Sequence, residues 1–144
     1  DELVDLRVAS HPFRLLSNVE AHLKFQQPLM TPLSMLPESI RDSLAGKEVF
    51  DFGLAVQPGV FEFSDCHCVL PTSLTVAYAI AAAACGRANR IYLAGFDGYS
   101  TNDPRNAEVD DLLAGFSEAG DVPVILAITP SRFSVRAVSV FSLS

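Results

Sequence analysis

The segment covering residues 73–85 most constrains what this chain can fold into. It is rich in alanine, almost wholly apolar, and followed by Gly86, a residue type that commonly ends helices. Alanine-rich sequence predicts a helix, and a helix that is apolar all round must be covered by other elements on several sides. The chain is therefore expected to build a layered structure around this helix.

Apolar runs elsewhere predict strands. Residues 91–96 form a continuous apolar run, which is typical of a central strand in a parallel sheet. The other predicted strands cover residues 4–9, 29–31, 49–56, 60–63, 122–128 and 135–141. Gln57-Pro58-Gly59 suits a type II turn, so we predict a β-hairpin between the strands on either side of it.

Helical spacing of apolar residues predicts three more helices. The first follows Ser10 as a cap, has Pro12 in its first turn, and ends before Pro28. Its inward face is predicted to carry Phe13, Leu16, Val19 and Leu23. The helix at 37–46 should bury Ile40 and Leu44, and the helix at 103–119 should bury Val109, Leu112, Leu113 and Phe116. Strands alternating with helices predict one domain, residues 1–144, of the α/β class. The expected fold is a three-layer Rossmann-like, open, mostly parallel sheet with helices on both faces and one β-hairpin.

Composition narrows the function classes. The chain has 144 residues and a net charge of -7, which argues against nucleic acid as a partner, because a phosphate backbone attracts clustered Lys and Arg. The longest apolar run, residues 76–85, is far short of the roughly 20 residues that span a membrane. The first residues, Asp1 and Glu2, show no signal-peptide pattern and no initiator Met, so we expect a piece excised from a longer protein. Three cysteines without a plausible pairing predict a reduced, cytoplasmic protein.

Polar residues follow several predicted strands, and open α/β sheets place their sites beyond the carboxyl ends of parallel strands. These candidates are Ser10, His11 and Arg14; Thr31 and Ser34; Asp97 and Tyr99; and Thr129 and Arg132. The start of the 73–85 helix can join them, because helix N-termini attract phosphate. The alternative interpretation is that these residues are caps and turns, which use the same residue types.

Metal and cofactor motifs are weak. Asp65-Cys66-His67-Cys68 contains zinc-ligand types, but neighbouring side chains of an extended segment alternate sides, so no metal site is predicted. His22 is predicted to be a surface residue. No G-x-G-x-x-G or G-x-x-x-x-G-K-[ST] motif occurs, which disfavours dinucleotide binding and P-loop hydrolysis. The acidic residues after Asp97 are interpreted as a solvated helix whose carboxylates complement its dipole.

Several segments together resemble a known family. They are HPFRLL (11–16), PLMTPLSMLPESI (28–40), DFGLAVQPGVFEFSDCHCVLPTSLTVAYAIA (51–81), RIYLAGFDGY (90–99) and ITPSRFSV (128–135). Nearly the whole chain resembles the C-terminal domain of bacterial aldolase-like proteins, in which an HMG-CoA-lyase-like barrel, akin to 4-hydroxy-2-oxovalerate aldolases, precedes this domain. The resemblance implies that the barrel of the parent chain is a partner. It also implies that a divalent metal and the lyase chemistry belong to that barrel, with no cofactor in this domain.

Residues 71–99 also resemble, more remotely, the nucleotide-sugar half of bacterial sialyltransferases. The helix start contacts the nucleotide phosphate in that pattern, which would correspond to Thr72, Ser73 and Thr75. This chain has Leu74 where the pattern has a glycine, and no histidine follows His67, although the pattern has a catalytic one beyond the strand. The resemblance therefore implies ligand binding rather than sugar transfer.

Three functional hypotheses follow. The first is an accessory, non-catalytic domain that binds a nucleotide, a nucleotide-sugar or a phosphorylated small molecule through Ser10, His11, Arg14, Thr72, Ser73, Thr75, Asp97 and Tyr99. The second is a glycosyltransferase-like catalytic domain with Asp97 or His11 as general base, which burial of Asp97 would favour. The third is a structural role, in which an apolar face of residues 135–141 forms a homodimer.

Overall fold

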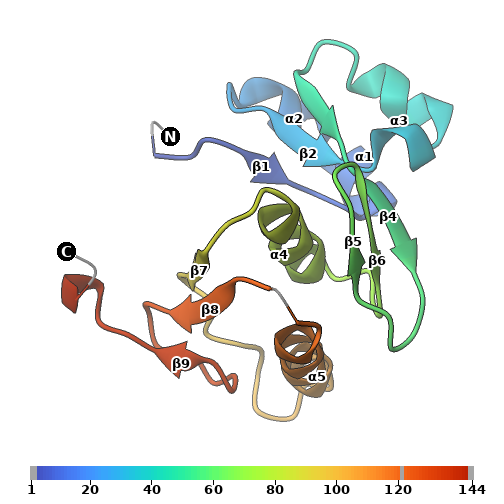
Figure 1. The fold of residues 1–144 in the computed structure, drawn as a ribbon. Helices are drawn as coiled ribbons and strands as arrows, with labels where there is room; N and C mark the ends of the chain where they lie inside the picture. The colour runs from blue at the N-terminus through green and yellow to red at the C-terminus, as the bar shows by residue number, and fades with distance from the viewer. Residues whose placement is uncertain (1–2, 121, 143–144) are drawn as a thin grey trace. The chain divides into compact units, whose positions relative to one another are not determined.

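The computed structural model describes residues 3–120 and 122–142. Two compact units divide the chain: Asp1–Ala82, which we call the N-terminal unit, and Ala83–Ser144, the C-terminal unit. Helices and three small, mostly parallel sheets make the fold mixed α/β, as predicted (Figure 1). Each unit is described by itself below.

The first sheet of the N-terminal unit is parallel and has the strand order β1-β2-β3. Its strands are β1 (Arg7–Val8), β2 (Leu29–Thr31) and β3 (Val49–Asp51). Between β1 and β2 the chain forms α1 (Pro12–Ser17) and α2 (Val19–Lys24); between β2 and β3 it forms η1 (Leu33–Met35) and α3 (Glu38–Ser43). Each parallel connection thus contains helix, as the sequence pattern predicted.

The core of this part of the N-terminal unit consists of leucine and isoleucine from β2 and from the helices on both sides of it in sequence. Its fully or almost fully buried members are Leu15, Leu29, Leu36, Ile40 and Leu44. The inward face predicted for the helix at 37–46 is therefore confirmed, since Ile40 and Leu44 are both buried.

The prediction of one long helix after Ser10 is wrong: the segment forms two short helices, and most of the predicted inward face is exposed. The chain breaks at Asn18, whose φ of -120° and ψ of 17° separate α1 from α2. Leu15 is buried, whereas Phe13 is 78% exposed and Leu16 and Leu23 are exposed as well; Val19 packs against the core as predicted. The break changes which side chains point inward, because the apolar spacing that identified the face assumed one continuous helix.

The second sheet of the N-terminal unit has the order β4-β6-β5, with β4 (Gly53–Val56), β5 (Glu62–Phe63) and β6 (His67–Leu70). The predicted turn exists: the Val60 N–H donates to the Gln57 carbonyl at 3.1 Å, and Gly59 has a φ of 74°. The predicted hairpin around it is wrong, however, because β4 pairs in parallel with β6 and the antiparallel hairpin joins β5 to β6. Burial explains the exchange, since β6 carries the buried residues Cys68 and Leu70 and so takes the central place.

The alanine-rich segment forms α4 (Thr75–Cys85), with Tyr78, Ile80 and two alanines buried. Gly86 follows the helix, but the left-handed residue is Arg87, whose φ is 58°. The Ala88 N–H donates to the Ala83 carbonyl and the Arg87 N–H to the Ala84 carbonyl, at 3.0 and 2.9 Å, which is the Schellman arrangement. The predicted end of the helix at Gly86 is thus confirmed. The left-handed residue that closes the motif is the next one, Arg87.

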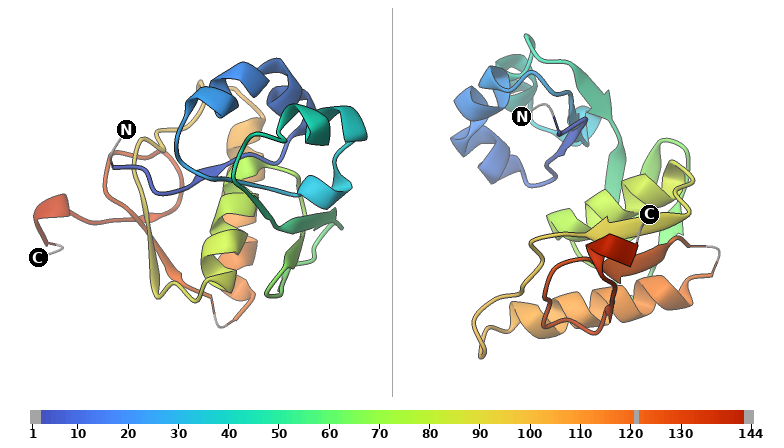
Figure 2. Two further views of the ribbon diagram at one scale, coloured as in Figure 1. Left: turned by 90° about the horizontal axis from the view of Figure 1, so that it is seen from above. Right: turned by 90° about the vertical axis from the view of Figure 1, so that its left-hand side faces the viewer.

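The C-terminal unit contains a parallel sheet with the order β7-β8-β9. Its elements are β7 (Arg90–Leu93), α5 (Arg105–Glu118), β8 (Val124–Ala127), β9 (Arg136–Ala137) and η2 (Val140–Ser142). Figure 2 shows α5 lying on one side of this sheet, and the predicted inward residues Val109, Leu112, Leu113 and Phe116 are all buried. The last predicted strand is only two residues long, and the apolar side chains of Val140 and Phe141 are exposed.

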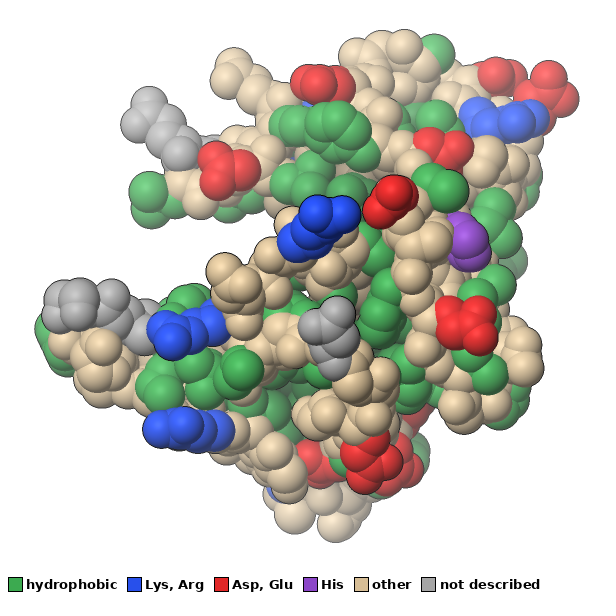
Figure 3. Space-filling model, in the orientation of Figure 1, with side chains coloured by type: hydrophobic (Ala, Val, Ile, Leu, Met, Phe, Trp, Pro, Cys, Tyr) green, Lys and Arg blue, Asp and Glu red, His purple; other side chains and the backbone are tan. Residues whose placement is uncertain are grey.

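Charged side chains are dispersed where the surface is visible. On the face drawn in Figure 3, the Lys and Arg side chains of the described residues lie apart from one another, some of them beside acidic side chains, without a continuous basic patch. Among the described helices, none has the length and apolar character needed to cross a bilayer.

Candidate functional site

A pocket of about 360 Å³ opens beyond the carboxyl end of β1 in the N-terminal unit. Four of the residues predicted from the sequence line it: Ser10, His11, Arg14 and Thr75. Ser10 Oγ and Thr75 Oγ1 lie 3.3 Å apart, within hydrogen-bond distance, although the two residues are far apart in sequence. The structure therefore brings together the polar residues that follow β1 and the first residue of α4.

The lining combines polar and apolar side chains. Arg14, Asn18, His11 and His22 carry nitrogen groups that can donate hydrogen bonds, and the hydroxyls of Ser10 and Thr75 add to them. The apolar part of the lining consists of Val8, Ala9, Ala21 and Phe25. Among the described residues that line the pocket there is no carboxylate, although the whole chain has a net charge of -7.

Local structure explains how these side chains converge. Pro12 stands at the first position of α1, where its missing N–H is not needed, so the helix begins directly after Ser10 and His11. At the other end of α1, Asn18 Nδ2 donates to the Arg14 carbonyl at 3.0 Å. The chain then turns into α2, which contributes Ala21 and His22 to the same pocket.

His22 is more enclosed than the sequence predicted. It is half-buried, and its Nδ1 atom is buried without a hydrogen-bond partner among the described residues. Burial lowers the pKa of His22 below its ordinary value, and the nearby positive charges of Arg7 and Lys47 lower it further. The imidazole is therefore neutral at neutral pH. Periodicity could not show this, because β1 and the segment before β3 provide those charges.

The other predicted phosphate-contacting residues lie outside this pocket's described lining. α4 begins at Thr75, so Thr72 and Ser73 belong to the preceding loop rather than to the helix, with Ser73 exposed and Thr72 half-buried. Thr31, at the end of β2, is fully buried, and its hydroxyl has no partner among the residues that the structure describes. The Ser34 N–H donates to both carboxylate oxygens of Asp51 at 3.2 Å.

In the C-terminal unit, the loops after β7 and β8 meet as the strand-end rule predicted. The Gly95 N–H donates to Thr129 Oγ1 at 2.9 Å, and the Arg132 N–H donates to the Asp97 carbonyl at 3.3 Å. Asp97 is exposed, and its carboxylate makes no hydrogen bond or ion pair within the described part of the chain. The burial that would have favoured Asp97 as a general base is absent.

Tyr99 is fixed by its own loop. Its N–H donates to Asn106 Oδ1 at 3.0 Å, and the guanidinium of Arg132 donates to its carbonyl. The Arg105 guanidinium lies 4.0 Å from the centre of the Tyr99 ring and also pairs with Asp103. Hydrogen bonds from Arg105 lower the pKa of the Asp103 carboxyl to about 2. The polar groups of this loop are bonded to one another, which favours a structural role for the loop over ligand binding.

The Asp65–Cys68 segment is split between the turn and the strand β6. Cys66 Sγ lies 3.8 Å from His67 Nδ1, so these two neighbours face each other, contrary to the predicted alternation. The reason is that Cys66 still belongs to the turn. Ser64 Oγ lies 2.5 Å from the same His67 nitrogen, while Cys68 is buried with its thiol directed to the Gly53 carbonyl at 3.6 Å. Among the described residues, no group of three His, Cys, Asp or Glu side chains is placed to hold a metal ion.

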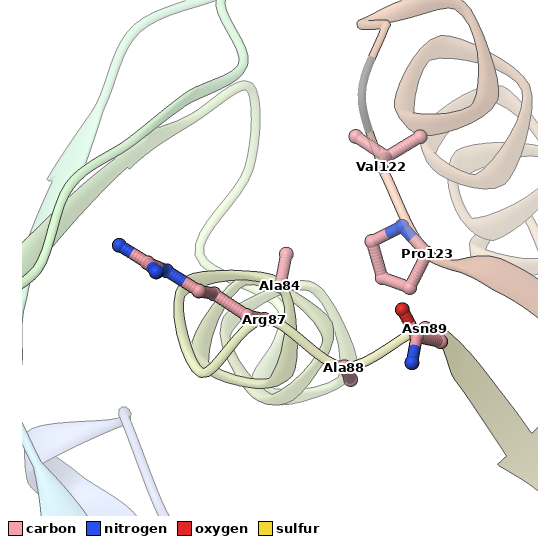
Figure 4. Close-up of a pocket in the computed structure, with 6 residues that line it drawn as sticks. All are labelled: Ala84, Arg87, Ala88, Asn89, Val122 and Pro123. Carbon is pink, nitrogen blue, oxygen red and sulfur yellow. The ribbon is translucent and has the colours of Figure 1, made fainter.

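A second pocket, of about 520 Å³, lies in the C-terminal unit near the amino ends of β7 and β8. Ala84, Asn89, Val122 and Pro123 form part of its lining, while the side chain of Arg87 extends away from them (Figure 4). Parallel sheets place their ligands at the carboxyl ends of strands, so this position is not that of the predicted site.

Comparisons of the chain with protein-family models, with curated proteins and with solved structures found no match. The site must therefore be interpreted from its own chemistry.

Proposed function

We propose that the N-terminal unit binds a small phosphorylated molecule in the pocket lined by Ser10, His11, Arg14 and Thr75. The observation that carries the proposal is the contrast between an acidic chain and a pocket whose described lining has an arginine and two histidines but no carboxylate. A bound anion would meet attraction and hydrogen-bond donors there, without repulsion from the lining.

The geometry suits a phosphate group with an attached neutral part. An arginine guanidinium binds two phosphate oxygens at once, and Arg14 makes no ion pair within the described part of the chain. The Ser10 and Thr75 hydroxyls are 3.3 Å apart, close enough to bind one further oxygen together. Thr75 also begins the 11-residue helix α4, whose N-terminal end favours negative charge. The side chains of Val8, Ala21 and Phe25 offer apolar contact to the rest of the ligand.

The proposed role is binding rather than catalysis. Asp97, one of the two candidate bases of the glycosyltransferase hypothesis, is exposed and lies in the loop after β7. No histidine follows His67 in the sequence to act with it. We propose further, on the sequence resemblance alone, that the chain is an accessory C-terminal domain of an aldolase-like protein and that the ligand serves that parent protein.

Isothermal titration of the chain with CMP, UDP-sugars and sugar phosphates tests this proposal. Arg14→Gln should weaken binding of a responding ligand roughly 10- to 100-fold, because hydrogen bonds to charged groups contribute about 1.5–3 kcal/mol. Arg41→Gln is the matched control, since Arg41 is also an exposed arginine on a six-residue helix but does not line the pocket. No binding across the panel, or an equal loss in both variants, would contradict the proposal.

We also propose that the parallel sheets belong to a three-layer Rossmann-like fold. Two features support this: helices connect β1 to β2, β2 to β3 and β7 to β8, and β1 is an edge strand of its sheet. The Arg7 amide donates to the Pro28 carbonyl, directly before β2, at 2.9 Å, and the Ala9 amide donates to the Met30 carbonyl of β2 at 3.0 Å. The alternation of a parallel ladder therefore directs the Val8 amide to the other side.

In the proposed fold β1 is an interior strand, and the Val8 amide is hydrogen-bonded. Amide hydrogen exchange followed by NMR should then show Val8 exchanging about as slowly as Arg7, whose amide is bonded to the Pro28 carbonyl. Exchange of Val8 at the rate of an unprotected amide, with Arg7 protected, would rule out the Rossmann-like arrangement and leave the pocket proposal untouched.

A further inference from the structure

The pocket contains two titratable imidazoles in addition to Arg14. His11 is exposed at the start of α1, and its ring centre lies 5.8 Å from that of Phe13. His22 comes from α2 and is half-buried, with its Nδ1 atom enclosed and lacking a hydrogen-bond partner among residues 3–120 and 122–142. A protonated imidazole donates through both ring nitrogens, so the unliganded pocket gives the charged form of His22 little stabilisation.

Within the described part of the chain, the two charged side chains of other elements that shift the pKa of His22, those of Arg7 and Lys47, are both positive. Arg7 of β1 lies over the Phe25 ring, with its Cζ 3.3 Å from the ring centre, and Lys47 donates to the Phe25 carbonyl. Both act on His22 by charge repulsion. Arg14 shares the pocket from α1, while on α2 itself Glu20 and Lys24 are both exposed and of opposite sign. Among the described residues, no carboxylate of another element is found to offset these positive charges at His22.

We infer that binding of an anion in this pocket is coupled to proton uptake by His22. The inference rests on the proposed phosphate-binding function. A bound phosphate group supplies the missing negative charge, which favours the protonated imidazole. Because the bound protein then holds protons more tightly than the free protein, the affinity increases as the pH falls through the imidazole range. A rise of one pKa unit on binding corresponds to about a tenfold gain in affinity.

Titration calorimetry with UDP-glucose tests the coupling, since the charge on its diphosphate diester is the same at both ends of the pH range used. Binding should be roughly tenfold tighter at about pH 5.5 than at about pH 7.5. Measurements at one intermediate pH, in two buffers with different ionisation enthalpies, should show net proton uptake. Binding without uptake or pH dependence would overturn the coupling alone. Absence of UDP-glucose binding at both pH values would overturn the coupling, whereas absence of binding across the whole ligand panel would overturn the proposed function as well.

Single-residue variants test whether His22 is the group that takes up the proton. His22→Gln should remove most of the pH dependence, whereas Arg14→Gln should weaken binding at both pH values by a similar factor. His67→Gln is the control: His67 is exposed in the β5–β6 hairpin, outside the pocket lining, and its loss should leave the full pH dependence. An NMR titration of the His22 ring in the unmodified chain avoids any folding defect of the variant. It should show a higher pKa with UDP-glucose than without, and an unchanged pKa would overturn the inference.

Discussion

Tyr78→Ala is expected to lower the free energy of unfolding of the N-terminal unit by about 3–5 kcal/mol, the usual cost of truncating a large buried aromatic side chain. Tyr78 is 0% exposed, and its ring centre lies 5.5 Å from that of Phe52. Its hydroxyl donates to the Phe52 carbonyl, and burial raises the pKa of this phenol, so the group remains a neutral donor. The substitution would leave both a cavity and an unpaired carbonyl. Urea unfolding followed by circular dichroism measures the loss.

Two further variants separate the causes. Tyr78→Phe keeps the ring and removes only the hydroxyl, so it should cost about 1–3 kcal/mol, the penalty of leaving the Phe52 carbonyl unpaired. Tyr92→Ala is the control for tyrosine removal as such, because Tyr92 is 38% exposed. A loss for Tyr78→Ala no larger than that for Tyr92→Ala would contradict the buried position of Tyr78 in the core.

Gly98→Ala is expected to destabilise the C-terminal unit by about 2–4 kcal/mol, through backbone strain and the loss of one hydrogen bond. Gly98 has a φ of 103°, which L-residues rarely adopt. A Cβ at this position would lie 2.1 Å from Cδ and 2.4 Å from Cγ of Arg132. The arginine would have to move, and its donation to the Tyr99 carbonyl would be lost. Thermal unfolding compared with that of the unmodified chain measures the effect.

Gly95→Ala is the matched control in the same loop. Gly95 also has a positive φ, of 66°, but a Cβ there would meet no atom within 4 Å, so only the left-handed penalty of about 1–2 kcal/mol applies. The double variant Gly98→Ala/Arg132→Ala removes the clash, and its cost should be less than the sum of the two single costs. Equal effects at Gly95 and Gly98, with additive costs in the double variant, would show that contact with Arg132 is unimportant.

The predictions from sequence succeeded where one local pattern decides the outcome. The inward face of α5 was predicted correctly because its apolar spacing is uninterrupted from Val109 to Phe116. Ile40 and Leu44 were assigned to the core for the same reason. The prediction of one helix after Ser10 failed because the chain breaks at Asn18. The spacing of apolar residues does not reveal such a break. Likewise, the Gln57–Val60 turn was found, but which strands pair across it depends on residues farther along the chain.

The candidate site divides in the same way. Strand ends and helix starts pointed to Ser10, His11, Arg14 and Thr75, because these positions follow from local signals and from the rule for parallel strands. The meeting of Ser10 with Thr75, and the enclosure of His22 beside Arg7 and Lys47, join segments that are distant in sequence. The spacing of apolar residues along the sequence does not predict contacts between such distant segments.

By itself, the sequence determined the α/β class of this protein, the identity of most helices and strands, and the polar residues at the strand ends, since each depends on neighbouring residues. Only the tertiary structure decided that an acidic chain forms a pocket whose described lining has no carboxylate. It also decided that Asp97 is an exposed loop residue. The physical reason is that burial and charge environment arise from side chains that long-range packing brings together.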